Sequence, residues 1–513
     1  SGGVTDLLGG EGLKNADLTL NVNADELTTS GFGDVNGVPM ELYWREDFAK
    51  GRTDQDADTS LLVMSGSPDE DDIAALGVDI SSYIEGRTRA EATFLGRNLK
   101  FRVGYFSADA SDAKLMISPI GWSKSPSSPA SINGTMLLSN DGVELAPLLV
   151  TGEGVDLTAN FKFGSRDSGT YNGKVTANML GRNKLLADIS KVENQPLKIM
   201  ASGEVFDAAP LLARTSVSSS NENVAEDTQE EVDFDLLLHA DTLILQNGEQ
   251  LRSADLKLVF KGGEPTVLDF RATDSNGETS AYLSVTELDL RPLSVSSGDA
   301  GSILRGLGLF AHMQGGSLVL ESETDSWGDT LTLNGTLTVN EASLISKSNL
   351  DAEVTEGVIS GLDDYLNDGS VKLDVTEVPF SYVNGLLDIS NLKANGPSLG
   401  MTMEGQIQTS EQKINVNGVV VPAYGLNSLL GKIPLVGSLF SGGSGKGLFG
   451  VTYRVKGSTE APEVSVNALS GLAPGFLRIL FEGRKGKVSD VEGTETVTEK
   501  EQSSDLKEKR QQR

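Results

Sequence analysis

Gly396-Pro397-Ser398-Leu399-Gly400 carries the spacing of a serine nucleophile elbow. That motif places an activated serine on a turn between a strand and a helix, within reach of a histidine base. Here the motif joins two strand-like runs instead. The only two histidines, His239 and His312, each stand in an apolar-patterned setting that is typical of a structural histidine. We therefore expect no catalytic site and no enzyme.

Asp54-Gln55-Asp56-Ala57-Asp58 begins like a calcium-binding loop. Such a loop needs glycine at its sixth position for the turn and glutamate at its twelfth for bidentate binding. Thr59 and Ser65 occupy those positions, so we expect no metal site.

Gly442 to Gly447 resembles a phosphate-binding loop in its glycine content. However, Lys446 is followed by Gly447 rather than serine or threonine, and Phe440 occupies the position of the first glycine. We expect no nucleotide and no other cofactor.

Composition narrows the function classes. The 513 residues are 38% hydrophobic, contain no cysteine, and carry a formal net charge of -31. A nucleic-acid surface needs a basic patch, so we expect no nucleic-acid partner. The same charge disfavours a body that lies flat on an anionic membrane, so membrane contact should be confined to the ends.

Most of the chain shows strand periodicity. Runs of about six residues alternate between apolar and polar side chains and are separated by short Gly/Asn/Asp turns, as in an antiparallel sheet covered on one side. A sheet of this many strands must curl, split or close. The fold class we expect is mostly β, with a few short helices. If the sheet curls with its apolar faces inward, it becomes an elongated, curled antiparallel sheet that forms an open hydrophobic groove.

Two helices interrupt the strands. Ser67, Pro68 and Glu70 form a capping box that starts a helix ending near Gly77. Between Gly301 and Phe310 the spacing of Ile303, Leu304, Leu307 and Phe310 is helical.

We divide the chain at its one acidic, serine-rich stretch. Residues 1–213 form the first part of the groove, 214–231 an acidic flexible linker or loop, and 232–487 the second part. Residues 488–513 are too polar to bury a core and are expected to be a disordered charged tail.

The stretch 414–481 changes from strand to apolar helix spacing over 424–440, where Pro434 ends or kinks the helix. It is too interrupted to span a membrane. It is either a plug that closes the end of a β structure or a segment that dips into a bilayer surface.

The same stretch resembles the C-terminal signature of the AsmA-like family, with the YhdP-type branch nearest. The resemblance is carried by Val421-Pro422-Ala423-Tyr424, Asn427-Ser428-Leu429-Leu430-Gly431, Ile433-Pro434-Leu435-Val436-Gly437, Gly447-Leu448-Phe449, Tyr453, Val466-Asn467-Ala468-Leu469-Ser470 and Ala473-Pro474-Gly475-Phe476-Leu477-Arg478. Weaker similarity covers most of the remaining chain.

The resemblance implies a Gram-negative envelope protein of the periplasm. It implies an anchor in the inner membrane through an N-terminal helix that precedes this chain, contact with the outer membrane at the C-terminal end, and phospholipids as partners. The implied function is non-enzymatic transport of phospholipid between the two membranes along the groove.

Periodicity alone favours apolar faces packed together as sandwiches, whereas the resemblance favours an open trough. In the trough, acyl chains would contact Leu18, Leu20, Phe101, Val103, Leu157, Phe161, Phe163, Leu236, Leu258, Phe260, Leu318, Leu333, Leu373, Met401, Met403, Val451 and Tyr453.

The C-terminal end supplies the other candidates. The membrane or end segment comprises Leu426, Leu429, Leu430, Ile433, Leu435, Leu439, Phe440, Phe476 and Leu477. Arg478, Arg484 and Lys485 follow apolar residues and either hold lipid phosphate or form a solvated end.

An alternative function uses the same strands differently. A periplasmic scaffold or assembly factor would hold client outer-membrane proteins by strand addition at an exposed sheet edge. A lipid bridge needs a continuous apolar floor, whereas such a scaffold needs an unpaired edge and can keep a dry core.

Overall fold

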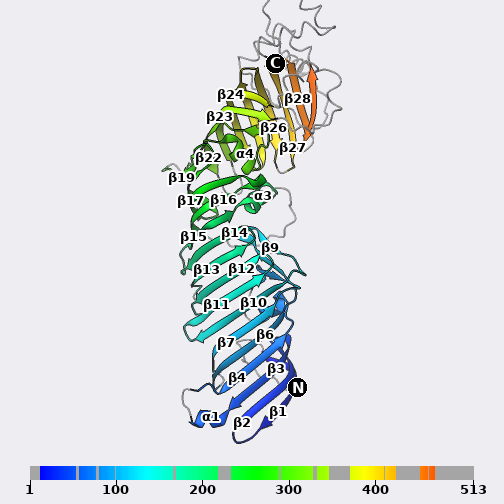
Figure 1. Ribbon diagram of the computed structural model, residues 1–513, viewed down its shortest axis with the longest axis vertical. Coiled ribbons are helices and arrows are strands. Elements are labelled where there is room, and N and C mark those ends of the chain that lie inside the picture. Colours follow the sequence, from blue (N-terminus) through cyan, green and yellow to red (C-terminus); the bar gives the residue numbers. More distant parts are fainter. Residues whose placement is uncertain are drawn as a thin grey trace, which may run out of the picture.

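The computed structural model describes residues 12–53, 57–76, 80–98, 100–165, 169–217, 233–287, 290–326, 332–345, 370–409, 411–422, 451–459 and 462–467. They form one elongated, open, curled sheet of 26 strands and a small sheet of three strands (Figure 1). The expected mostly-β groove is confirmed.

The first part of the large sheet is a series of antiparallel neighbours that follow one another in chain order. Its strands are β1 (Leu13–Val22), β2 (Glu26–Val35), β3 (Val38–Asp47), β4 (Ser60–Gly66), β6 (Arg89–Arg97), β7 (Lys100–Asp109), β10 (Ala130–Ser139), β11 (Gly142–Gly152), β12 (Val155–Phe163), β13 (Tyr171–Leu180), β14 (Asn183–Lys191) and β15 (Leu197–Asp207).

The second part continues the same sheet. Its strands are β16 (Phe234–Ile244), β17 (Gln250–Lys261), β18 (Glu264–Thr273), β19 (Glu278–Ser284), β20 (Leu293–Ser297), β21 (Met313–Gln314), β22 (Ser317–Ser326), β23 (Thr332–Ile345), β24 (Ser370–Val383), β25 (Leu386–Asn395), β26 (Leu399–Gln408), β27 (Lys413–Pro422), β28 (Val451–Ser458) and β29 (Pro462–Asn467).

The two parts join through a parallel pair. β15 and β16 run in the same direction, with Leu197 opposite Phe234 and Asp207 opposite Ile244. A parallel pair needs a crossover connection, and the chain between these strands begins with α3 (Ala209–Val217).

Short elements cover one end of the strands, which we call the closed rim. They are α2 (Glu70–Ala75), the small sheet of β5 (Ile84–Glu85), β8 (Lys114–Ile117) and β9 (Trp122–Lys124), η1 (Ser118–Ile120), α3, η2 (Gln246–Gly248) and α4 (Ala300–Gly306). In Figure 1, β9 and α3 lie along the side of the molecule opposite α1 (Phe48–Thr53). The opposite ends of the strands form the open rim.

The helix starts differ in detail from those expected. α2 is capped by Asp69, not Ser67, and its capping box pairs Asp69 with Asp72, each side chain accepting from the other's backbone N–H. Aspartate is as good an N-cap as serine, and the Pro68 carbonyl instead accepts from the Thr88 N–H.

The second expected helix is present as α4, which begins after the cap Asp299. Ile303 and Leu304 are buried, but the helix ends at Gly306, and Leu307 and Phe310 are 38% and 41% exposed. The expected apolar face therefore covers only the first half of that stretch.

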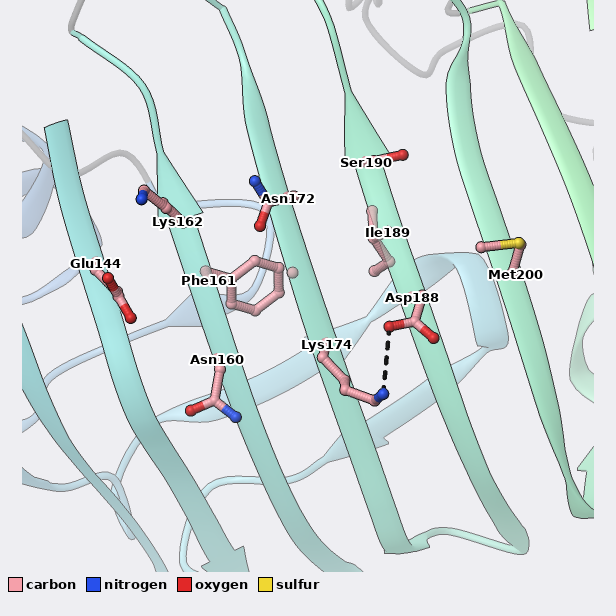
Figure 2. Close-up of a pocket in the computed structure, with 11 residues that line it drawn as sticks. Glu144, Asn160, Phe161, Lys162, Asn172, Lys174, Asp188, Ile189, Ser190 and Met200 are labelled. Atoms are coloured by element: carbon pink, nitrogen blue, oxygen red, sulfur yellow. Dashed lines mark ion pairs between the residues drawn. The ribbon is translucent and has the colours of Figure 1, made fainter. Parts of the chain in front are cut away.

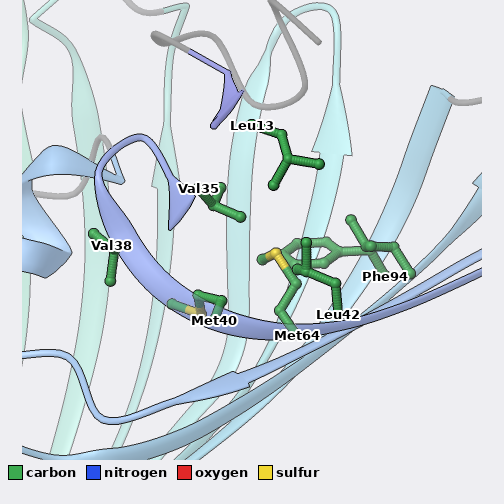
Figure 3. Packing of buried hydrophobic residues seen from close by; sticks show 8 residues of the cluster. Leu13, Val35, Val38, Met40, Leu42, Met64 and Phe94 are labelled. Atoms are coloured by element: carbon green, nitrogen blue, oxygen red, sulfur yellow. The ribbon is translucent and has the colours of Figure 1, made fainter. Parts of the chain in front are cut away.

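The core is distributed along the sheet as separate clusters. Figure 3 shows the first, in which Leu42, Met64 and Phe94 pack on adjacent strands near the N-terminal end. At the closed rim, Ile303 of α4 packs on Leu243 and Leu251, and Trp122 packs on Val155 and Leu157. These two clusters anchor cover elements to one face of the sheet, whereas the cluster of Leu373, Ile389, Leu392 and Ala394 is formed by strand residues.

Candidate functional site

One face of the sheet carries an unbroken line of apolar side chains. Directly paired residues of neighbouring strands share a face. Following the pairing from β1 to β29 gives what we call the central row: Leu20, Thr29, Trp44, Leu62, Phe94, Gly104, Met136, Leu145, Phe161, Gly173, Ile189, Ile199, Leu236, Leu258, Leu268, Leu283, Leu293, Ser322, Gly335, Phe380, Ile389, Gly405, Val416, Val455 and Val464.

The adjacent row on the same face contains no polar residue from β1 to β24. It consists of Leu18, Gly31, Leu42, Met64, Ala92, Phe106, Gly134, Leu148, Ala159, Val175, Ala187, Ala201, Leu238, Leu256, Phe270, Ala281, Val295, Leu320, Leu337 and Val378. The central row is interrupted by only two hydroxyl residues, Thr29 and Ser322. The floor of the groove is therefore continuously apolar through both parts of the sheet, including the parallel junction.

The other face of the sheet is polar. The corresponding line there runs through Asp17, Phe32, Glu41, Ser65, Glu91, Ser107, Asn133, Leu149, Thr158, Thr176, Leu186, Ser202, His239, Asp255, Arg271, Ser280, Ser296, Val319, Thr338, Glu377, Lys393 and Thr402. Most members are charged or carry hydroxyl or amide groups. This difference between the faces identifies the apolar one as the candidate functional surface.

Of the residues predicted to line the groove, all whose side chains the structure describes lie on this face except Val103; the side chain of Val451 is outside the described part. Val103 is paired with Leu95 and Leu137 on the polar face, while Phe101 is paired with Gly96 and packs against Phe94 on the apolar face. A bulge between Leu95 and Gly96 inserts Arg102, so the two residues that alternation placed together fall on opposite faces.

The groove has unequal rims. At the closed rim the cover elements contact one another in sequence: η1 meets Pro210 of α3 at Gly121, and α4 packs on Leu245 beside η2. At the open rim the apolar face ends in partly exposed side chains, among them Leu20, Val22 and Phe163. Access from solvent to the floor is therefore from the open rim.

Aromatic rings gather near the open rim. Phe161, Phe163 and Tyr171 form a chain with ring centroids 5.9 Å and 6.1 Å apart, and Phe234 stacks on Phe260 at 4.8 Å. Burial raises the pKa of Tyr171, and the neighbouring Tyr83 adds to the shift. The rings make the edge of the floor apolar, and the tyrosine hydroxyl adds a polar group at the end of its ring.

Lys191 is a site residue that the sequence prediction missed. It is paired with Tyr171 at the end of β14, on the apolar face, and its Nζ donates to the Gln195 carbonyl at 2.7 Å. Its position could have been found from alternation, because Leu185, Ala187 and Ile189 precede it with the same parity. It places a cation where the open rim meets water.

Tyr453, another predicted lining residue, lies on β28 near the described C-terminal end of the groove. Its hydroxyl donates to the Thr402 carbonyl at 3.0 Å, and burial raises its pKa to about 12. The phenol is therefore neutral and held in place by a backbone contact.

Two hollows lie on the polar face rather than in the groove. Figure 2 shows the first, about 430 Å³, where Lys174 and Asp188 form an ion pair at 3.7 Å. The second, about 750 Å³, lies between Phe32 and Glu91. Both are shallow and open, so we do not place the function there.

The chemistry-bearing motifs do not assemble into a site in the described residues. Ser398 lies in the turn between β25 and β26, where the Gly396 N–H donates to the Leu399 carbonyl. His239 is on the polar face beside Asp255, and His312 packs edge-on against Phe310. No group of three or more His, Asp or Glu side chains there is placed to hold a metal, and Asp58 pairs with Arg102.

The predicted end segment and its cations lie outside the described residues, as do the phosphate-loop candidate and the tail. These are 424–440, 442–447, Phe476, Leu477, Arg478, Arg484, Lys485 and 488–513. Of the predicted linker, 214–217 belong to α3 and the rest is outside. Among the helices that the structure describes, none has the length and apolarity to cross a membrane.

The arrangement was compared with known proteins at the level of families, curated sequences and solved structures. No family model matches the chain, and no curated protein or solved structure is significantly similar to it.

Proposed function

We propose that the protein carries phospholipid along the apolar face of its sheet and catalyses no reaction. The observation that supports this is the central row, which remains apolar across the whole sheet apart from Thr29 and Ser322. A sheet that only needed a core would require apolar residues where cover elements pack. Here they continue along the floor as far as the open rim.

The energetics favour an apolar occupant. Each large apolar side chain left in water forgoes about 1.5–3 kcal/mol of burial free energy. Acyl chains would recover that energy where side chains of the floor are exposed or half-buried, whereas Leu62, Phe94, Leu283, Ile389 and Val416 are already buried by the protein itself. With strands about 4.8 Å apart, 26 of them give a path of roughly 120 Å, which is long enough for several lipids in series.

The unequal rims suggest how a lipid would lie. Its acyl chains would contact the floor between the rims, and its phosphate would stay in water at the open rim, near Lys191 and the aromatic tips. A lipid could then move along the row by exchanging equivalent apolar contacts, in a direction set by a gradient from outside the protein.

The cellular setting of the proposal comes from the AsmA-like resemblance. On that resemblance, we propose that the protein lies in the periplasm and is held in the inner membrane by a preceding N-terminal helix. Its C-terminal end would face the outer membrane, and its partner would be phospholipid.

The test is to purify the chain without detergent and quantify bound phospholipid by mass spectrometry. Several lipids per chain are expected. A lipid-free, monodisperse protein would contradict the proposal and would favour the scaffold that binds clients by strand addition.

A further inference from the structure

The first polar residue of the central row has a second polar side chain directly beside it. Thr29 on β2 is paired with Trp44 on β3, so their Cβ atoms are about 5 Å apart. Both belong to the face that carries the apolar floor, and Trp44 packs against the cluster of Leu42, Met64 and Phe94.

Neither side chain has a hydrogen-bond partner within the described residues. Thr29 as a whole is 8% exposed. Its hydroxyl and the indole N–H of Trp44 are both buried and unpaired. Buried polar atoms of this kind are nearly always paired in proteins, so an unmatched pair indicates an absent partner.

The chemistry of the pair specifies the partner. An indole N–H can only donate, and a threonine hydroxyl can donate as well, whereas a carbonyl oxygen has two lone pairs. A single carbonyl oxygen therefore satisfies both groups. Ser322, the other hydroxyl residue of the row, is directly paired with Leu293 and Gly335, neither of which has a polar side chain, so it lacks this cross-strand arrangement.

The surroundings orient such a ligand. Towards the closed rim, Leu42 and Met64 continue the apolar floor. Towards the open rim, the next residue of β3 on the same face is Glu46. Its buried carboxylate accepts hydrogen bonds from the Thr59 hydroxyl at 2.7 Å and from the Ser60 hydroxyl at 2.5 Å. A chain lying on the floor with its carbonyl at Thr29 would keep its polar end towards that polar border.

We propose that Thr29 and Trp44 form a subsite for the ester carbonyl of an acyl lipid at the N-terminal end of the groove. The subsite rests on the proposed function and adds to it a point of recognition. Elsewhere on the floor, Ser322 and Thr376 each offer a single hydroxyl. Thr29 and Trp44 offer two converging groups, so this pair would hold a lipid in one register.

The experiment compares vesicles of ester-linked phosphatidylcholine with vesicles of ether-linked phosphatidylcholine of equal chain length, because the ether lipid lacks the carbonyl. The full chain carries ¹⁵N-labelled tryptophan, and the Trp44 indole signal is assigned by its loss in Trp44→Phe. The chain has three tryptophans, so assignment is direct.

Ester lipid should move the Trp44 indole proton downfield, and ether lipid should not. Ester lipid should also bind about five-fold more tightly, as expected from one or two added hydrogen bonds. Thr29→Val, which keeps the side-chain volume, should remove most of that preference, and Trp122→Phe at the closed rim should retain it.

The outcomes separate the two proposals. Binding of both lipids with the same Trp44 response would overturn the subsite and leave the groove function standing. Binding of neither lipid would overturn the groove function, and the subsite with it.

Discussion

The ring of Phe161 lies over the backbone of Gly173 on the neighbouring strand. A Cβ placed on Gly173 would meet the ring carbon Cδ1 at 2.2 Å. Phe106 lies over Gly134 in the same way, with its Cζ 2.4 Å from such a Cβ. Glycine paired with an aromatic residue lets the ring cover the strand instead of projecting from it. The aromatic side chains of the floor therefore lie flat against the sheet.

Gly173→Ala should destabilise the protein by about 1–3 kcal/mol, because the new methyl group displaces the Phe161 ring from its packed position. Gly400→Ala on β26 is the matched control, since the nearest atom to its Cβ would be 3.7 Å away, so we expect little loss of stability. The measurement is the free energy of unfolding in urea. Equal stability of the two variants would show that the ring moves aside freely.

Leu236→Asp and Leu237→Asp test the two faces with adjacent residues. Leu236 is in the central row, whereas Leu237 is 48% exposed on the polar face. We expect Leu236→Asp to lower bound lipid several-fold while the chain still folds, because a carboxylate disfavours acyl chains beside it. Leu237→Asp should change neither property.

Circular dichroism and lipid mass spectrometry check this prediction. Global unfolding of Leu236→Asp would instead place Leu236 in a closed core. Loss of lipid from both variants would mean that the faces are not functionally distinct.

Asp274 ties the β18–β19 turn to the start of α4. Its carboxylate accepts from the Thr279 and Ser297 hydroxyls at 2.7 Å and 2.9 Å and from the N–H groups of Asn276 and Gly277. Partial burial raises its pKa, but these hydrogen bonds together bring the pKa below its usual value. The carboxylate form is therefore favoured by folding.

A lowered pKa in the folded state stabilises the protein above the unfolded-state pKa of about 4, and that stability is lost as the pH falls through the folded-state value. Asp274→Asn should cost about 1–3 kcal/mol at pH 7. The cost should shrink below pH 4. Urea unfolding of both proteins at pH 7 and pH 3 measures it, and a cost that does not depend on pH would contradict the assignment.

Sequence periodicity predicted the one-sided antiparallel strands, because one face of each strand is apolar and the other is polar. The open groove was predicted from the AsmA-like resemblance, since periodicity alone favoured packed sandwiches. It placed Phe161 and Met401 correctly since alternation needs only local order. It misplaced Val103 because the bulge at Arg102 depends on pairing with β6, which no local pattern reveals. The position of Asp69 as the cap of α2 is a choice between equally good capping residues.

Features that depend on the pairing register of the strands could not be predicted from the sequence. The parallel pairing of β15 with β16 follows from where the crossover returns the chain, and the juxtaposition of Thr29 with Trp44 follows from the β2–β3 turn. Lys191 is intermediate: its parity is visible in the sequence, but its place beside Tyr171 at the open rim is not.

His239 on the polar face should titrate above the usual histidine range. Its Nδ1 lies 2.8 Å from Asp255, and its Nε2 lies 3.7 Å from Asp241. The hydrogen bond to Asp255 raises the pKa of His239 most, and the charges of both aspartates add to it. The folded state therefore favours the imidazolium, and its stabilisation is complete below about pH 6.5 and lost as the pH rises through the folded-state pKa.

Imidazole NMR titration of the full chain checks this, with His312 giving the only other histidine signal. Asp255→Asn should return the pKa of His239 towards 6.5, and Asp241→Asn should lower it less, because its carboxylate is farther away. High salt should reduce the shift, since the pair is half exposed and screened. A pKa of His239 that is unchanged in Asp255→Asn would show that the contact with Asp255 does not persist in solution.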